Sequence, residues 1–179
     1  MNTQPHLDEI HERARLVKLL ALDVDGVLTD GRLYFSNSGE EIKSFSTLDG
    51  QGIKLLQTSG VAVAILTARK SQLVSNRASN LGIVHVAQGC ENKLATLTTL
   101  VKSLQLELSQ VAYVGDDLPD LACIRKVAMG IAVPNAHPLL REYAFCTTTQ
   151  AGGMGAVREV CDWILQAQGN YDQLVAAYL

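Results

Sequence analysis

Short apolar runs alternate with segments of helical periodicity along most of the chain. The runs are bounded by polar residues or glycine and cover residues 17–24, 61–66, 82–87, 111–115 and 129–133. Continuous apolar runs of this length are typical of strands in a parallel sheet that is covered on both faces. The alternation therefore predicts an α/β fold, doubly wound and Rossmann-like, around a mostly parallel sheet.

The segments between these runs predict helices. Apolar residues recur at roughly helical spacing in residues 50–59, 71–82, 92–105, 118–127 and 155–169. Glycine commonly follows the last residue of a helix, and Gly60 and Gly82 occupy such positions. A short C-terminal tail, residues 170–179, comes after the last predicted helix.

One segment interrupts the alternation. Residues 31–46 contain two strand-like pieces on either side of Asn37-Ser38-Gly39, a sequence that favours a tight turn. We expect a β-hairpin inserted directly after the first strand. The sequence contains no internal repeat, linker or low-complexity stretch, so we expect one domain over residues 1–179.

Composition excludes several classes of protein. The net charge is -3, so nucleic acid and anionic membranes are not expected partners. No apolar stretch approaches the roughly 20 residues of a membrane span, and the N-terminus lacks the apolar core of a secretory signal. The four cysteines form no CxxC pair, which indicates reduced thiols. We therefore expect a cytoplasmic protein.

Polar residues gather where the predicted strands end. Ligands of open α/β sheets bind beyond the carboxyl ends of the strands, and right-handed connections bring those ends to one edge. The residues concerned are Asp23, Asp25, Thr67, Lys93, Asp116, Asp117 and Asp120. Each alone has an ordinary explanation, such as a helix cap or a solvated lysine. Together, and in this order, they predict a carboxylate cluster beside a hydroxyl and a lysine.

This cluster suits phosphoryl transfer. Several converging carboxylates need a cation to remain ionised, and hard oxygen ligands favour Mg²⁺. A cation, a lysine and a hydroxyl form an electropositive cradle for phosphate. One aspartate can then attack phosphorus, and a second can transfer protons. A calcium-binding EF-hand loop is excluded because Val27 and Leu28 occupy positions that need Asp or Asn and Gly.

The same residues resemble the four motifs of the haloacid dehalogenase superfamily of phosphohydrolases. The first motif of that superfamily reads DxDx(T/V), and "DVDGVLTD" begins at Asp23. Thr67, Lys93 and "GDDLPD" follow in the superfamily's order. The resemblance implies that Asp23 is the nucleophile and Asp25 the general acid and base. It implies that Thr67 and Lys93 bind the phosphoryl group.

The resemblance also implies a metal site. Mg²⁺ would be held by the carboxylates of Asp23 and Asp116 and by the backbone carbonyl oxygen of Asp25. Asp117 and Asp120 would support these ligands.

A closer resemblance, to the capless family of 3-deoxy-D-manno-octulosonate 8-phosphate phosphatases, runs over nearly the whole chain. It is carried by "LDVDGVLTDG", "NSGEEIKSF", "VAYVGDDLPDL" and "AGGMGAVREVCDWILQAQG". It implies a Mg²⁺-dependent phosphatase that forms an aspartyl-phosphate and acts in lipopolysaccharide inner-core synthesis. It also implies a homotetramer in which the hairpin, residues 31–46, joins subunits and a neighbour's tail, residues 170–179, helps to close the site. No cap domain is expected, because residues 26–66 leave room only for the hairpin and one helix.

The family resemblance implies the substrate contacts as well. They are Asp25, Ser46, Thr47, Leu48, Asp49, Gly50, Lys54, Arg69, Arg77 and Lys93. Basic residues at such positions suit a phosphate dianion that carries an additional carboxylate.

Three residues depart from the family's usual pattern: Leu48, Ala68 and Met154. Leu48 and Met154 stand where the family commonly has a positive charge, so one alternative stays open: a phosphatase of a related nonulosonate or sialic-acid phosphate, or of sugar phosphates more broadly. A second alternative is a non-catalytic assembly domain, because the hairpin and the tail favour oligomers.

Overall fold

The structure, a computed structural model, describes residues 5–179 and is built around a six-stranded sheet. The strand order is β5-β4-β1-β6-β7-β8, and neighbouring strands are parallel throughout. The strands are β1 (Leu19–Leu22), β4 (Ala62–Thr67), β5 (His85–Gln88), β6 (Val111–Gly115), β7 (Met129–Ala132) and β8 (Cys146–Thr147). The predicted α/β fold with a mostly parallel sheet is confirmed.

β1 lies inside the sheet because its sequence is wholly apolar. All its residues are buried, and Leu19 pairs with Ala62 of β4 on one side and with Val111 of β6 on the other. The chain winds outward from β1 through β4 and β5, then returns to the opposite side of β1 to form β6. Ligands of doubly wound sheets bind at such a reversal. The carboxyl ends of β1 and β6 therefore mark the expected site.

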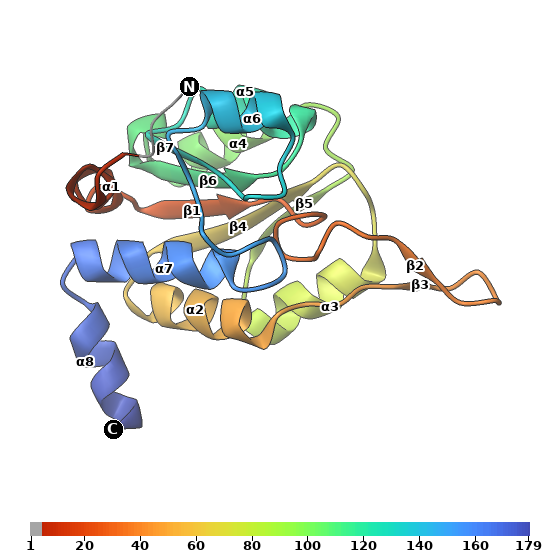
Figure 1. Cartoon of the computed structure of the whole chain (residues 1–179), viewed down its shortest axis with the longest axis horizontal. Coiled ribbons are helices and arrows are strands. Elements are labelled where there is room, and N and C mark those ends of the chain that lie inside the picture. Colours follow the sequence, from red (N-terminus) through yellow and green to blue (C-terminus); the bar gives the residue numbers. More distant parts are fainter. Residues whose placement is uncertain (1–4) are drawn as a thin grey trace.

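Helices cover both faces of the sheet (Figure 1). One face carries α2 (Thr47–Thr58), α3 (Gln72–Leu81) and α7 (Ala156–Ala167), and the other carries α4 (Lys93–Ser103), α5 (Leu121–Ile124) and α6 (Pro138–Tyr143). α1 (Leu7–Ala14) packs against α7. Within the described residues, no helix has the length and apolarity that a membrane span needs.

Two local details differ from what the sequence predicted. The helix expected over residues 118–127 is a 3-10 turn, η2 (Leu118–Asp120), followed by the short α5. The reason is that the Asp117 and Asp120 side chains hydrogen-bond to the backbone of this turn and tighten it. The two-residue strand β8 was not predicted, because so short a pairing leaves no periodicity.

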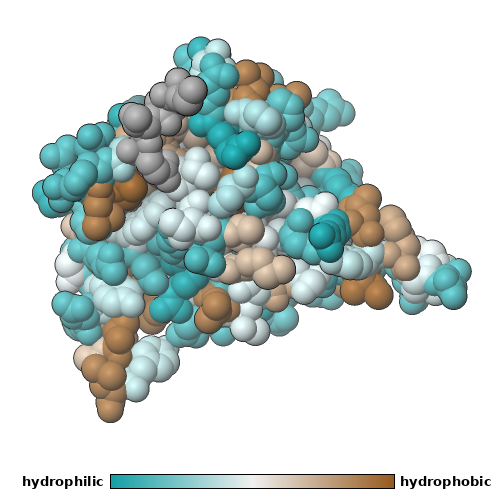
Figure 2. All heavy atoms as spheres, viewed as in Figure 1, coloured by the Kyte–Doolittle hydropathy of each residue, from teal (hydrophilic) through white to brown (hydrophobic). Residues whose placement is uncertain are grey.

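The predicted hairpin is present and projects from the body of the molecule (Figure 1). It consists of β2 (Tyr34–Phe35) and β3 (Glu41–Ile42), which pair antiparallel. Leu33, Phe35 and Ile42 are exposed, and apolar side chains gather on this arm in Figure 2. Between Asp25 and the start of β4 the structure contains only this hairpin and α2, and no separate cap.

The C-terminal tail forms α8 (Tyr171–Val175) and η3 (Ala176–Tyr178), which point away from the sheet (Figure 1). Gln51 Nε2 of α2 donates a hydrogen bond of 2.6 Å to the hydroxyl of Tyr178. The expected single domain over residues 1–179 stays a prediction.

Candidate active site

The turn after β1 places Asp23 and Asp25 at the carboxyl edge of the sheet. Asp23 continues the ladder, because its N–H donates to the Val114 carbonyl at 3.1 Å, and it is almost fully buried. Gly26 then adopts a φ of +89°, and a Cβ there would collide with the Asp116 carboxylate. A residue without a side chain therefore allows the first loop to approach the loop after β6.

Lys93 bridges two buried carboxylates. It is the first residue of α4, and Asn92 caps that helix by accepting a hydrogen bond from Ala95 N–H at 3.0 Å. Its Nζ lies 2.8 Å from Asp23 Oδ1 and 2.6 Å from Asp120 Oδ1. All three side chains are at most 9% exposed. These residues, far apart in the sequence, form one ion-paired unit.

Asp120 is held by donors on both oxygens. Besides Lys93, the Tyr113 hydroxyl donates to Asp120 Oδ1 at 2.6 Å. Oδ2 accepts from the N–H groups of Asp116, at 3.1 Å, and Asp117, at 3.4 Å. Asp120 therefore fixes the position of Lys93 and the backbone that carries Asp116.

The carboxylates at this edge are protonated more readily than free ones. Burial, together with the charge of Asp120, raises the pKa of Asp23 to about 6 even though Lys93 opposes the shift. Burial and the neighbouring acids raise the pKa of Asp116 to about 8. Burial lowers the pKa of Lys93, but Asp23 and Asp120 outweigh it and the net pKa is raised. Concentrated negative charge of this kind favours a bound cation.

The donor set fits Mg²⁺. Carboxylate oxygens of Asp23, Asp116 and Asp120 all lie within 4.8 Å of one another, and hard oxygen ligands are those that Mg²⁺ prefers. Asp120 already receives donors on both oxygens, so Asp23 and Asp116 are the carboxylates better able to accept a cation. The ligand set of Asp23, Asp25 and Asp116 stays a prediction, and these three residues lie together at this edge.

A cavity of about 310 Å³ opens onto these residues. Its lining includes Asp23, Asp25, Thr67, Arg69, Lys93 and Asp116. The predicted catalytic residues and the predicted metal ligands thus share one cavity. Thr67 ends β4 and is buried, and its Oγ1 accepts from Arg69 N–H at 3.3 Å.

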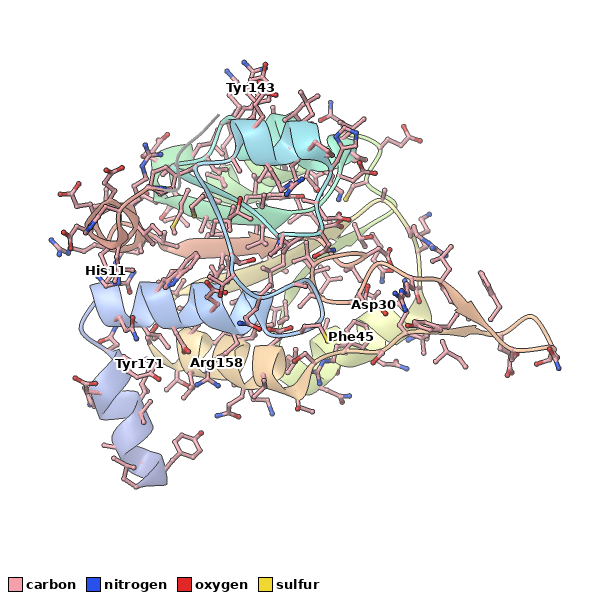
Figure 3. The ribbon with its side chains drawn as sticks, in the orientation of Figure 1. His11, Asp30, Phe45, Tyr143, Arg158 and Tyr171 are labelled. Atoms are coloured by element: carbon pink, nitrogen blue, oxygen red, sulfur yellow. The ribbon has the colours of Figure 1, made fainter. Side chains whose placement is uncertain are left out.

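The remaining predicted substrate contacts do not line this cavity. They are Ser46, Thr47, Leu48, Asp49, Gly50, Lys54 and Arg77. Ser46 caps α2, and its carbonyl oxygen accepts from Arg77 at 2.9 Å. Arg77 also lies against Phe45, which Figure 3 shows, together with Asp30, where the hairpin joins the body.

Asp49 has a structural environment of its own. It is buried, and its Oδ1 accepts from Arg158 N–H at 2.8 Å near the start of α7. Figure 3 shows Arg158 on the helix that lies along α2. Asp49 Oδ2 is buried without a hydrogen-bond partner, and burial raises the pKa of the carboxyl group.

Two of the unusual residues lie together in a different hollow. Leu48 and Met154 are both exposed and line a cavity of about 390 Å³ beside α7. Ala68, in contrast, lines the cavity that contains the acids.

Sequence reasoning missed three groups that the structure brings to the site. Lys43 forms an ion pair with Asp25, and Tyr113 donates to Asp120. Asn135 joins the loop after β1 to the loop before α7, because its Nδ2 donates to Gly26 O at 3.4 Å and its Oδ1 accepts from Gly152 N–H at 3.0 Å. Glu41 lies in β3 and Lys43 directly follows it, so their spacing places both side chains on one side of the hairpin, but it does not indicate that Lys43 pairs with Asp25.

The comparisons with known proteins agree with this geometry. The family of haloacid dehalogenase-like hydrolases matches residues 78–160. The chain is 50% identical over 169 residues to the 3-deoxy-D-manno-octulosonate 8-phosphate phosphatase KdsC of Salmonella typhimurium, covering 94% of this chain and 88% of that protein. It is 49% identical over 165 residues to KdsC of Escherichia coli K12, covering 92% of this chain and 88% of that protein.

Solved structures are similar too. The 3-deoxy-D-manno-octulosonate 8-phosphate phosphatase of Moraxella catarrhalis, in complex with magnesium ion, phosphate ion and KDO, superposes with a TM-score of 0.95 and 46% identity over 97% of this chain and all of that one. A probable YrbI family phosphatase from Pseudomonas syringae superposes with a TM-score of 0.94 and is 53% identical, over 96% of this chain and 97% of that one. The chain belongs to the 3-deoxy-D-manno-octulosonate 8-phosphate phosphatase family of haloacid dehalogenase-like hydrolases.

Proposed function

We propose that this protein is a Mg²⁺-dependent phosphatase that hydrolyses 3-deoxy-D-manno-octulosonate 8-phosphate to the free sugar acid and phosphate. The observation that carries the proposal is the single cavity in which Asp23, Asp25, Thr67 and Lys93 meet. A family relative with 46% identity holds magnesium, phosphate and KDO. The reaction belongs to the lipopolysaccharide inner-core pathway.

In the first step, a carboxylate oxygen of Asp23 attacks phosphorus and the bond from phosphorus to the sugar oxygen breaks. The product on the enzyme is an aspartyl-phosphate. Asp25 gives a proton to the departing sugar oxygen, which leaves as the alcohol. Lys93 Nζ, already 2.8 Å from Asp23, also binds the phosphoryl oxygens, and the Thr67 hydroxyl donates to them.

In the second step, Asp25 removes a proton from water, which attacks phosphorus and releases Asp23 and inorganic phosphate. Asp23, Asp116 and the backbone carbonyl of Asp25 would hold Mg²⁺, which when bound neutralises charge on the phosphoryl group and between the acids. Asp120, fixed by Tyr113 and by backbone N–H groups, keeps Lys93 in place throughout.

The exposed apolar residues of the hairpin support assembly with further copies of this chain. Leu33, Phe35 and Ile42 project into solvent together, and exposed apolar clusters commonly mark protein interfaces. We propose that the chain forms a homotetramer in the cytoplasm. In this assembly the tail of one subunit, residues 170–179, helps to close the site of another.

Leu48 and Met154 favour a second candidate substrate. Both stand where the family commonly carries a positive charge, and both line one hollow near the predicted substrate contacts. A phosphatase of a related nonulosonate phosphate, or of sugar phosphates more broadly, has the same catalytic residues and differs only in selectivity.

The test is release of inorganic phosphate from 3-deoxy-D-manno-octulosonate 8-phosphate and from a panel of sugar phosphates, with Mg²⁺ and with EDTA. The proposal predicts the highest kcat/KM for the eight-carbon sugar acid and no release in EDTA. Equal or higher kcat/KM for another sugar phosphate would transfer the function to the second candidate. Failure to hydrolyse any phosphate ester would overturn both phosphatase candidates and support the alternative of a non-catalytic assembly domain.

A further inference from the structure

Lys43 reaches from the hairpin to Asp25. It follows β3 directly, and its side chain is only 2% exposed. Its ammonium group is ion-paired with Asp25 Oδ1 and lies 3.5 Å from Glu41 Oε1. A lysine is almost never buried to this extent unless its charge is paired. The ion pair with Asp25 therefore compensates the burial of the Lys43 charge and is part of the structure of the site.

The strand geometry explains how the hairpin presents this charge. Glu41 is in β3 and Lys43 directly follows it, so their side chains project to the same side of the hairpin, while Ile42 between them is 56% exposed. Glu41 Oε1 also accepts from Arg69 at 2.7 Å. Asp25, Lys43, Glu41 and Arg69 form a chain of alternating charge that attaches the hairpin to the cavity.

We propose that Lys43 is a positioning residue for Asp25, fixing its carboxyl group through Oδ1 and leaving Oδ2 for proton transfer. The inference rests on the proposed function, in which Asp25 protonates the leaving sugar oxygen. Among the described residues, Asp25 Oδ2 has no hydrogen-bond partner. Lys43 can donate to Oδ1 whether or not Oδ2 carries the proton, since the carbonyl oxygen of a carboxylic acid also accepts. Misplacement of a reacting group by about 1 Å costs roughly 100-fold in rate, so its orientation matters.

The experiment compares two phosphate esters that differ in their need for a proton. A sugar alkoxide is a poor leaving group and must be protonated, whereas p-nitrophenolate leaves without a proton. The kcat/KM value covers the steps up to phosphoryl transfer to Asp23 and excludes the later hydrolysis. We expect Lys43→Met to lower kcat/KM about 10- to 100-fold for 3-deoxy-D-manno-octulosonate 8-phosphate. The loss of kcat/KM for p-nitrophenyl phosphate should be smaller by a factor of at least about ten.

Three further variants make the result decisive. Lys43→Arg keeps a cation within reach of Asp25 and should recover most of the loss. Lys102→Met, in the last turn of α4 and exposed, should leave both kcat/KM values at the wild-type level. Asp25→Asn should show the same preference for p-nitrophenyl phosphate, more strongly. Thermal unfolding checks the fold of each variant, and Lys43→Gln takes the place of Lys43→Met if the latter does not fold.

Equal losses for both esters, or no loss, in the Lys43 variants would overturn the inference. If Asp25→Asn still discriminated between the esters in that case, the proposed function would stand and only the inference about Lys43 would fall. If Asp25→Asn failed to discriminate, the acid role of Asp25 in the proposed function would be overturned, and the role of Lys43 with it.

Discussion

Removal of the Tyr113 hydroxyl tests how much the buried network contributes to stability. Tyr113 and Asp120 are both fully buried, and their hydrogen bond of 2.6 Å is made to a carboxylate that also holds Lys93. A hydrogen bond to a charged group contributes about 1.5–3 kcal/mol to stability. Tyr113→Phe removes the donor, keeps the ring, and leaves Asp120 Oδ1 with Lys93 alone.

We therefore expect Tyr113→Phe to lower the free energy of unfolding by about 2 kcal/mol. For a chain of this size that corresponds to a decrease in Tm of roughly 4–8 °C. Urea unfolding at one fixed protein concentration, without Mg²⁺, measures the change in the free energy of unfolding directly. Tyr143→Phe is the matched control, because Tyr143 is 45% exposed on α6, and its effect should stay within about 0.5 kcal/mol. A loss for Tyr113→Phe no larger than the control's would refute the reasoning.

Two further predictions concern the metal site and selectivity. The folded, metal-free protein binds protons at Asp116, whose pKa is raised to about 8 by burial and neighbouring acids, while the unfolded chain titrates near pH 4. The contribution of Asp116 to stability is therefore present below about pH 4 and is lost as the pH rises to about 8, and added Mg²⁺ should raise Tm more at pH 8 than at pH 5. An equal or smaller increase at pH 8, measured by calorimetry, would contradict this. Leu48→Arg and Met154→Arg each introduce a positive charge beside one hollow, and each should raise kcat/KM for the sugar-acid phosphate, which carries a carboxylate besides its phosphate, by about 2- to 5-fold, as expected for an exposed charge pair. Unchanged or lower values in steady-state assays would exclude a role for these charges in recognition.

The sequence predicted those parts of the fold that depend on local patterns. β1, β4 and β6 are continuous apolar runs, and the acids that end β1 and β6 could be placed at one edge because parallel strands share a direction. The hairpin was predicted from Asn37-Ser38-Gly39, a local turn sequence.

The contacts that were missed depend on packing between distant segments. Nothing near Lys43 in the sequence indicates that it pairs with Asp25, since the direction of the hairpin arm is set only when the fold forms. Tyr113 reads as one more apolar residue of a buried strand, and its hydroxyl acquires a role only through the tight turn that brings Asp120 back beneath it. Asn135 likewise meets Gly26 and Gly152 only in the folded chain.

The most direct test of the account is to identify the residue that receives the phosphoryl group. Asp25→Asn can still transfer phosphate from p-nitrophenyl phosphate, but it cannot activate the water that removes it, so the aspartyl-phosphate should accumulate. Borohydride reduces an aspartyl-phosphate to homoserine, which peptide mass spectrometry locates in the chain. The account predicts homoserine at position 23, dependent on Mg²⁺ and absent from Asp23→Asn carrying the same Asp25→Asn change. Homoserine at another aspartate, or none while p-nitrophenol is released, would contradict it.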